Sequence, residues 1–292
     1  MPEKIKSLIR DYYDGKITRR EFKRRAVILT GSLAIADGLL DCASPASVAA
    51  QVDANDPAVL WHNVEYNSKT GPVSGYLARP SAAGKYPALV LIHANQGLND
   101  HIRDVARRLA KQSYVTLAPD YLSHRGGTAK VNPKGEGLGN IRELAPWRQV
   151  AEDTDFAFTF LNALTDVQGN RRGLIGFCWG GEMTFSSATQ VRGLKAVVVF
   201  YGRSPNPIDL VKQIEAPVLA HYGEKDPGVD QDIPATVEAM KKYNRPYDYK
   251  IYPGAFHGFY NEAGDRYNPE AAKEAWSKTL DLFAKNLKNL SS

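Results

Sequence analysis

A glycine-rich turn between a predicted strand and a predicted helix constrains the fold of this chain more than any other segment. The apolar run Gly173-Leu174-Ile175 leads into Gly176-Phe177-Cys178-Trp179-Gly180-Gly181, and a helix-compatible segment begins near Glu182. Glycine on both sides of Cys178 permits a sharp, strained turn, and the helix after it offers free N–H groups and a positive dipole end. Such surroundings lower the pKa of a thiol and stabilise an oxyanion, so the segment predicts an exposed nucleophile. The alternative is a buried structural cysteine.

Two further residues follow Cys178 in an order that supports this prediction. Asp226 ends an apolar strand and polar loop at 216–226, and His257 ends a strand and glycine-containing loop at 249–257. G-x-C-x-G is the nucleophile turn of the α/β-hydrolase fold, with cysteine in place of the usual serine, and that fold orders its triad as nucleophile, acid, histidine. In open parallel sheets such residues lie at the C-terminal ends of strands. Taken singly, Asp226 could cap a turn and His257 could be a core imidazole.

The rest of the chain alternates predicted strands with predicted helices, which is typical of the α/β class. We predict an α/β-hydrolase fold over residues 56–292, with a mainly parallel sheet and helices on both faces. The expected strands are a hairpin at 64–77 with its turn at 70–72, then 88–93, 114–119, 195–201, 217–222 and 247–252. The expected helices are 100–112, 150–164 and 269–290.

Two segments of this body carry their own predictions. In the helix at 100–112, Val105, Leu109 and Ala110 are expected to face inward. Arg103, Arg107, Arg108 and Lys111 have a spacing that predicts a solvated basic face on the same helix. The segment 121–144 is rich in Gly, Lys and Arg, which predicts a mobile loop over the site.

Composition excludes several classes of function. The chain is 43% hydrophobic, enough for a substantial core, and its net charge of +5 is spread along the sequence without interleaved aromatic residues. We therefore expect no nucleic-acid partner. No apolar run is long enough to predict stable membrane insertion. The cysteines, Cys42 and Cys178, form no CxxC or His/Cys/acid cluster, so no metal site is expected. The oligomeric state is left open.

The sequence of residues 1–50 differs in character from that of the predicted domain at 56–292, and it allows two interpretations. Arg19-Arg20-Glu21-Phe22 is close to the twin-arginine export pattern, an apolar stretch covers 26–40, and Ser47-Val48-Ala49-Ala50 offers a cleavage site. This interpretation predicts a periplasmic or secreted protein whose mature chain starts near Gln51. The alternative is a helical arm of a cytoplasmic protein, which Asp37 within the apolar stretch favours.

The predicted chemistry is hydrolysis of a small-molecule ester or lactone. Cys178 would attack the carbonyl carbon, His257 would take the thiol proton and later protonate the leaving alkoxide, and Asp226 would orient the imidazole. The oxyanion would be held by the amide of Trp179, directly after the nucleophile, and by Asn95 in the loop after the strand 88–93. A non-catalytic protein or a redox sensor on the same scaffold remains the alternative.

Several separated motifs together resemble the dienelactone hydrolase (carboxymethylenebutenolidase) family. They are Gly176-Phe-Cys-Trp-Gly-Gly181, His93-Ala-Asn-Gln-Gly-Leu98-Asn99, Asp104-Val-Ala-Arg-Arg-Leu109-Ala and His257-Gly-Phe-Tyr. The resemblance covers roughly 58–290, and the leader at Arg19 resembles one bacterial branch of the family. It implies hydrolysis of a cyclic enol-lactone by a Cys-His-Asp triad without a cofactor.

The chain departs from this family at two positions. Ala94 stands where the family usually carries a Glu that contacts the resting cysteine, so Cys178 is expected to rely on His257 and the helix dipole. Asn261 stands where known members carry an Arg that binds the substrate carboxylate. The substrate-binding residues assigned here are Tyr260, Arg266 and Arg125, with Arg142 as a further candidate. For each arginine the alternative is a solvated surface residue.

Overall fold

The computed structural model describes residues 19–30 and 52–288 of the chain, which divides into the units Met1–Gln51 and Val52–Ser292. In the first unit, helix α2 spans Arg19–Thr30, so the twin-arginine pair begins a helix. The rest of the predicted apolar stretch and the predicted cleavage site lie outside the described residues, and export stays a prediction. Among the described helices, none combines the length and the apolar character that crossing a membrane requires.

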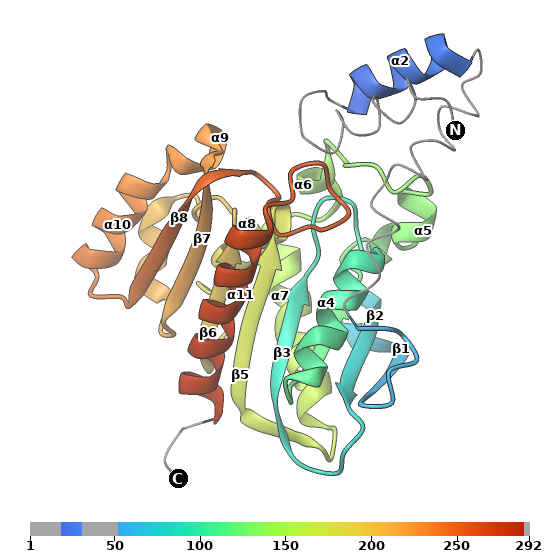
Figure 1. Cartoon of the computed structure of the whole chain (residues 1–292). Coiled ribbons are helices and arrows are strands. Elements are labelled where there is room, and N and C mark those ends of the chain that lie inside the picture. The colour runs from blue at the N-terminus through green and yellow to red at the C-terminus, as the bar shows by residue number, and fades with distance from the viewer. Residues whose placement is uncertain (1–18, 31–51, 289–292) are drawn as a thin grey trace. The chain divides into compact units, whose positions relative to one another are not determined.

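The unit Val52–Ser292 is built on an eight-stranded sheet in the order β1-β2-β4-β3-β5-β6-β7-β8 (Figure 1). β1 pairs antiparallel with β2 and β2 with β4, while every other neighbouring pair is parallel. The strands are β1 Val59–Ser68, β2 Gly71–Pro80, β3 Tyr86–Ile92, β4 Val115–Pro119, β5 Val167–Phe177, β6 Leu194–Phe200, β7 Val218–Lys225 and β8 Tyr247–Phe256. The sheet is therefore mainly parallel, as predicted.

Helices cover both faces of this sheet, α4 and α11 on one face and α7 and α8 on the other (Figure 1). The α-helices are α4 Asp100–Lys111, α5 Thr128–Val131, α6 Ile141–Leu144, α7 Trp147–Asn162, α8 Trp179–Ser187, α9 Pro227–Asp230, α10 Ile233–Lys242 and α11 Pro269–Phe283. Short 3-10 helices lie at Ser123–Arg125 and Ile208–Gln213, and a π-helical turn at Ala284–Lys288 extends α11.

Two hydrophobic cores separate the sheet from its two helical layers. Successive strand side chains point to opposite faces, so Leu89 and Leu91 of β3 pack in the core beneath α4 and α11, while Val90 and Ile92 pack in the core beneath α7 and α8. All four side chains are fully buried. Because β3 is buried on both of its faces, its sequence is a continuous apolar run.

Helix α4 corrects one prediction and agrees with another. Val105, Leu109 and Ala110 are buried, as their spacing predicts. The solvated basic face is wrong, because Arg107 and Arg108 are each only 6% exposed. Both pair with Asp104 on the same helix. Their other partners, Val52 and Tyr76 for Arg107 and Glu262 for Arg108, come from segments distant in sequence, which local periodicity does not reveal.

The segment 121–144 lies above the carboxyl ends of the strands, but it is more regular than the predicted loop. It contains α5, α6 and the 3-10 turn at Ser123–Arg125. The N–H of Leu138 donates to the carbonyl of Asn95 at 3.1 Å, and the amide of Asn132 donates to the carbonyl of Gln96 at 2.9 Å. These bonds hold the segment against the loop that follows β3.

Candidate active site

Cys178 lies on a strained turn between the end of β5 and the start of α8. Its φ of 60° and ψ of −120° lie in a region that L-residues rarely adopt. The turn is held at both ends: the N–H of Cys178 donates to the carbonyl of Phe200 at 3.0 Å, and its carbonyl accepts from the N–H of Glu182 at 3.1 Å. The strain projects a half-buried thiol out of the sheet edge.

The sequence analysis attributed the strained turn to the two glycines that flank Cys178, and the structure corrects this reason. These glycines permit close packing and do not adopt an unusual backbone angle. A Cβ on Gly176 would lie 2.2 Å from the carbonyl oxygen of Gly180, and one on Gly180 would lie 2.3 Å from that of His93. Neither glycine has a positive φ, whereas Cys178 does. The glycines therefore bring α8 down onto the sheet, and the cysteine itself carries the strain.

The structure brings Cys178, Asp226 and His257 into one hydrogen-bonded line. They directly follow β5, β7 and β8, so they meet at the same edge of the sheet. His257 Nε2 lies 3.0 Å from Cys178 Sγ, and His257 Nδ1 lies 2.6 Å from Asp226 Oδ2. Asp226 is buried, whereas His257 is half-buried. The imidazole thus lies between a thiol and a carboxylate, one at each ring nitrogen.

The surroundings of His257 favour its charged form. Burial alone lowers the pKa of His257, but its hydrogen bonds to Asp226 and Cys178 outweigh burial and raise that pKa to about 10. Because this value lies above the ordinary 6.5, the imidazole keeps its proton at neutral pH and loses it only as the pH rises through about 10. At neutral pH the imidazole of His257 therefore holds a proton next to Sγ.

Two backbone N–H groups, of Trp179 and Asn95, have no acceptor among the residues that the structure describes. Trp179 is the first residue of α8, where helical N–H groups have no partner within the helix. Asn95 lies in the loop that follows β3. Neither N–H donates a hydrogen bond to any other residue that the structure describes. Both residues line the cavity beside Cys178.

His93, which the sequence analysis did not single out, orients the second of these groups. His93 is fully buried, and its ring stacks on that of Trp179 with centroids 5.3 Å apart. Burial lowers the pKa of His93 and keeps it neutral. Its Nε2 accepts from the N–H of Tyr121 at 3.2 Å, so its Nδ1 carries the proton and donates to the carbonyl of Ala94 at 2.8 Å. In a trans peptide the C=O and N–H point in opposite directions, so this bond turns the N–H of Asn95 away from the buried ring.

Two cavities open at Cys178 and His257, which we call the reactive pair. The predicted substrate-binding residues differ in which of these cavities they line. Arg142 lines the larger cavity, of about 470 Å³, and Arg266 lines the smaller, of about 240 Å³. Arg125 is exposed and lines neither. Tyr260 also lines neither, because it is buried with its hydroxyl 3.3 Å from Arg108, so the structure does not support its assignment to substrate binding. Arg203 lines the larger cavity and was missed.

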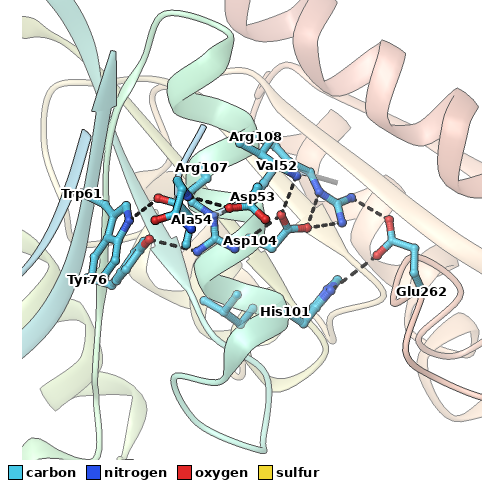
Figure 2. A network of polar contacts seen from close by, with 12 residues as sticks. Val52, Asp53, Ala54, Trp61, Tyr76, His101, Asp104, Arg107, Arg108 and Glu262 are labelled. Carbon is cyan, nitrogen blue, oxygen red and sulfur yellow. Dashed lines mark hydrogen bonds and ion pairs between the residues drawn. The ribbon is translucent and has the colours of Figure 1, made fainter. Parts of the chain in front are cut away.

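A buried ionic network holds the loop that carries His257 (Figure 2). Arg108 of α4 donates to Asp104 Oδ2 at 2.6 Å and to Glu262 Oε1 at 2.6 Å. Glu262 belongs to the segment between β8 and α11, five residues after His257. Asp104 Oδ1 in turn accepts from the N–H of Val52 at 3.0 Å. The network therefore joins the first described residue of this unit, helix α4 and the His257 loop.

The described residues offer no site suited to a metal ion. Among residues 19–30 and 52–288 no group of three or more His, Cys, Asp or Glu side chains could hold one.

Comparison with known proteins gives the family of the chain. The sequence profile of the dienelactone hydrolase family matches residues 73–287. A Methylorubrum extorquens protein named as a carboxymethylenebutenolidase is 31% identical over 274 residues, which cover 89% of this chain and 92% of the relative. A Bradyrhizobium protein named as a 2-oxo-3-(5-oxofuran-2-ylidene)propanoate lactonase is 36% identical over 234 residues, covering 76% and 92%.

A solved structure agrees with these sequence matches. The crystal structure of a Klebsiella pneumoniae protein described as a dienelactone hydrolase superposes with a TM-score of 0.72 at 29% identity, covering 78% of this chain and 99% of the other. The predicted α/β-hydrolase fold is confirmed by this match and by the sheet described above. The chain belongs to the dienelactone hydrolase family.

Proposed function

We propose that this hydrolase of dienelactone hydrolase type cleaves a carboxylic ester or lactone through Cys178, His257 and Asp226, by way of a thioester acyl-enzyme. The observation that carries the proposal is the continuous line from Asp226 Oδ2 through the imidazole to Cys178 Sγ, with contacts of 2.6 and 3.0 Å. Nucleophile, base and orienting acid within hydrogen-bond reach of one another are the signature of covalent catalysis.

The contacts at the site support a mechanism in two halves. Sγ attacks the carbonyl carbon, and the N–H groups of Trp179 and Asn95 hold the oxyanion that forms. The C–O bond then breaks, and His257 gives its proton to the leaving alkoxide oxygen. Water attacks the resulting thioester with His257 as the base, which releases the acid and returns the proton to the Cys178–His257 pair. Asp226 keeps Nδ1 protonated, so Nε2 faces the reaction throughout.

The proposal predicts a thioester on Cys178 that can be trapped. Mixing the protein with a slowly deacylating aryl ester and quenching in acid should add the acyl mass to one peptide, the one that contains Cys178. Hydroxylamine should remove that mass, because it cleaves thioesters. Turnover of the ester without any acylation of Cys178 would contradict the covalent mechanism.

His93 should affect the chemical step rather than binding. We expect His93→Leu to lower kcat by about ten- to a hundredfold with little change in KM, because it releases the Ala94–Asn95 peptide and misplaces one of two oxyanion donors; full loss of such a donor costs about 10²- to 10³-fold. His93→Asn should recover most of the rate, since its amide can donate from nearly the position of Nδ1.

A second measurement separates this role from a general loss of structure. Alkylation of Cys178 by iodoacetamide forms no oxyanion, so its rate should stay the same in both His93 variants. If alkylation slows in parallel with ester turnover, His93 acts on the fold of the site and not on the orientation of the Asn95 N–H.

A further inference from the structure

The two cavities at the reactive pair meet at only four residues. The larger and the smaller cavity share Asn95, Cys178, Tyr201 and His257, and no other lining residue. These four include the thiol, the imidazole and one oxyanion donor. The reacting carbon of a bound substrate would therefore lie at the junction, with separate space on either side of it.

The larger cavity is bounded by the segment above the sheet edge and by the region that follows Asp226. Its charged side chains already have partners: Arg142 Nε lies 3.1 Å from Glu182 Oε1, and Arg203 donates to the carbonyl of Gly228 at 2.7 Å. Its volume is about 470 Å³.

The smaller cavity lies on the other side of the pair, between the loop after β3 and the loop after His257. Ala94 and Cys178 both line it, and the side chain of Ala94 is a single methyl group. Phe177 supplies an apolar wall and Arg266 a polar one. Its volume is about 240 Å³.

The geometry of ester cleavage gives these two spaces different uses. When Sγ bonds to the carbonyl carbon, the acyl chain and the alkoxy oxygen leave that carbon in different directions. In a small lactone the two halves are joined in one ring and need only one space. In an open-chain ester they are separate, and each requires its own.

We propose that the substrates of this protein are open-chain esters whose acyl and alcohol groups occupy the two cavities separately; this inference rests on the proposed function. The thioester forms on Sγ with the acyl group in one cavity. The alcohol, protonated by His257, departs through the other. A side chain that fills one cavity should then limit the length of the acyl group or of the alcohol group, but not of both.

Two matched leucine substitutions test the separation. Ala94→Leu fills the smaller cavity. Gly139→Leu fills the larger one, at a position where a Cβ meets nothing within 4 Å and the backbone φ is not positive. The substrates are two series from methyl acetate: methyl esters of acids lengthened to octanoate, and acetates of alcohols lengthened to octanol. Each rate is divided by the same variant's rate on methyl acetate, which removes any general loss of activity.

We expect wild type to hydrolyse both series of esters. One variant should hydrolyse the long acyl esters poorly, and the other should hydrolyse the acetates of long alcohols poorly. Each variant should lower kcat/KM about tenfold or more for the long members of one series, in line with the cost of misfitting methylenes, and leave the other series unchanged. The inference is wrong if both variants restrict the same series, if neither restricts any, or if wild type rejects either series. Failure of the proposed function is distinct: neither methyl acetate nor any lactone would be hydrolysed, and no thioester would form on Cys178. Hydrolysis of lactones alone would overturn this inference and leave the proposed function standing.

Discussion

Cys178→Ala is expected to abolish ester turnover while leaving the protein folded. The loss in kcat should reach roughly six orders of magnitude, as seen when the nucleophile of a triad is removed. The free energy of unfolding should change by no more than about 1 kcal/mol, because the half-buried thiol contributes little to either core. Steady-state hydrolysis of a panel of aryl esters and lactones, with denaturant unfolding of the same preparations, measures both quantities.

The double variant makes this prediction sharper. Residues that act as a unit give non-additive losses, so Cys178→Ala combined with His257→Ala should be no slower than Cys178→Ala alone. His257→Ala alone should also lose most activity, since the leaving alkoxide then lacks its proton donor. Near-wild-type turnover in either single variant would overturn the assignment of the triad.

Arg108→Met is expected to destabilise the protein by about 3–5 kcal/mol, the cost of removing one partner from a buried ionic network. The Arg108 side chain is 6% exposed and joins two carboxylates, Asp104 and Glu262, that are equally buried. Methionine fills a similar volume, so lost packing contributes little to the expected change. Guanidinium unfolding of wild type and variant, with comparison of both midpoint and slope, gives the difference.

Lys111→Met on the same helix is the matched control. Its ammonium group pairs with Asp56 at 2.8 Å, but its side chain is 49% exposed. Exposed pairs contribute about 0–1 kcal/mol, so this variant should stay within about 1 kcal/mol of wild type. Equal effects of the two substitutions would show that the network around Arg108 does not stabilise the fold.

The arrangement of Cys178, Asp226 and His257 could be predicted from sequence because each directly follows a strand. Apolar runs mark parallel strands locally, and the carboxyl ends of such strands meet at one edge of the sheet. The order of three residue types along the chain therefore predicted their proximity in space. The position of Asn95 after β3 followed from the same argument.

Features that depend on distant partners could not be predicted in this way. Helical spacing alone placed Arg108 on a solvated face, because its partner Glu262 lies 154 residues away. Tyr260 follows His257 closely in sequence, yet the chain turns its hydroxyl toward Arg108 instead of the cavities. The role of His93 depends on which nitrogen meets the carbonyl of Ala94 and which meets the N–H of Tyr121, and sequence does not carry that information.

The packing around the turn at Cys178 has a consequence for how such an enzyme can diverge. A single methyl group on Gly176 or Gly180 would overlap backbone atoms of a neighbouring segment, and one on Gly202 would lie 2.2 Å from the backbone of Gly181. The half-buried Cys178, in contrast, lines both cavities. A single-nucleotide change converts cysteine to serine, which adds no atom at that position, whereas any side chain added at these glycines would overlap backbone atoms. In descendants of this chain the nucleophile is therefore freer to be exchanged than the glycines that present it.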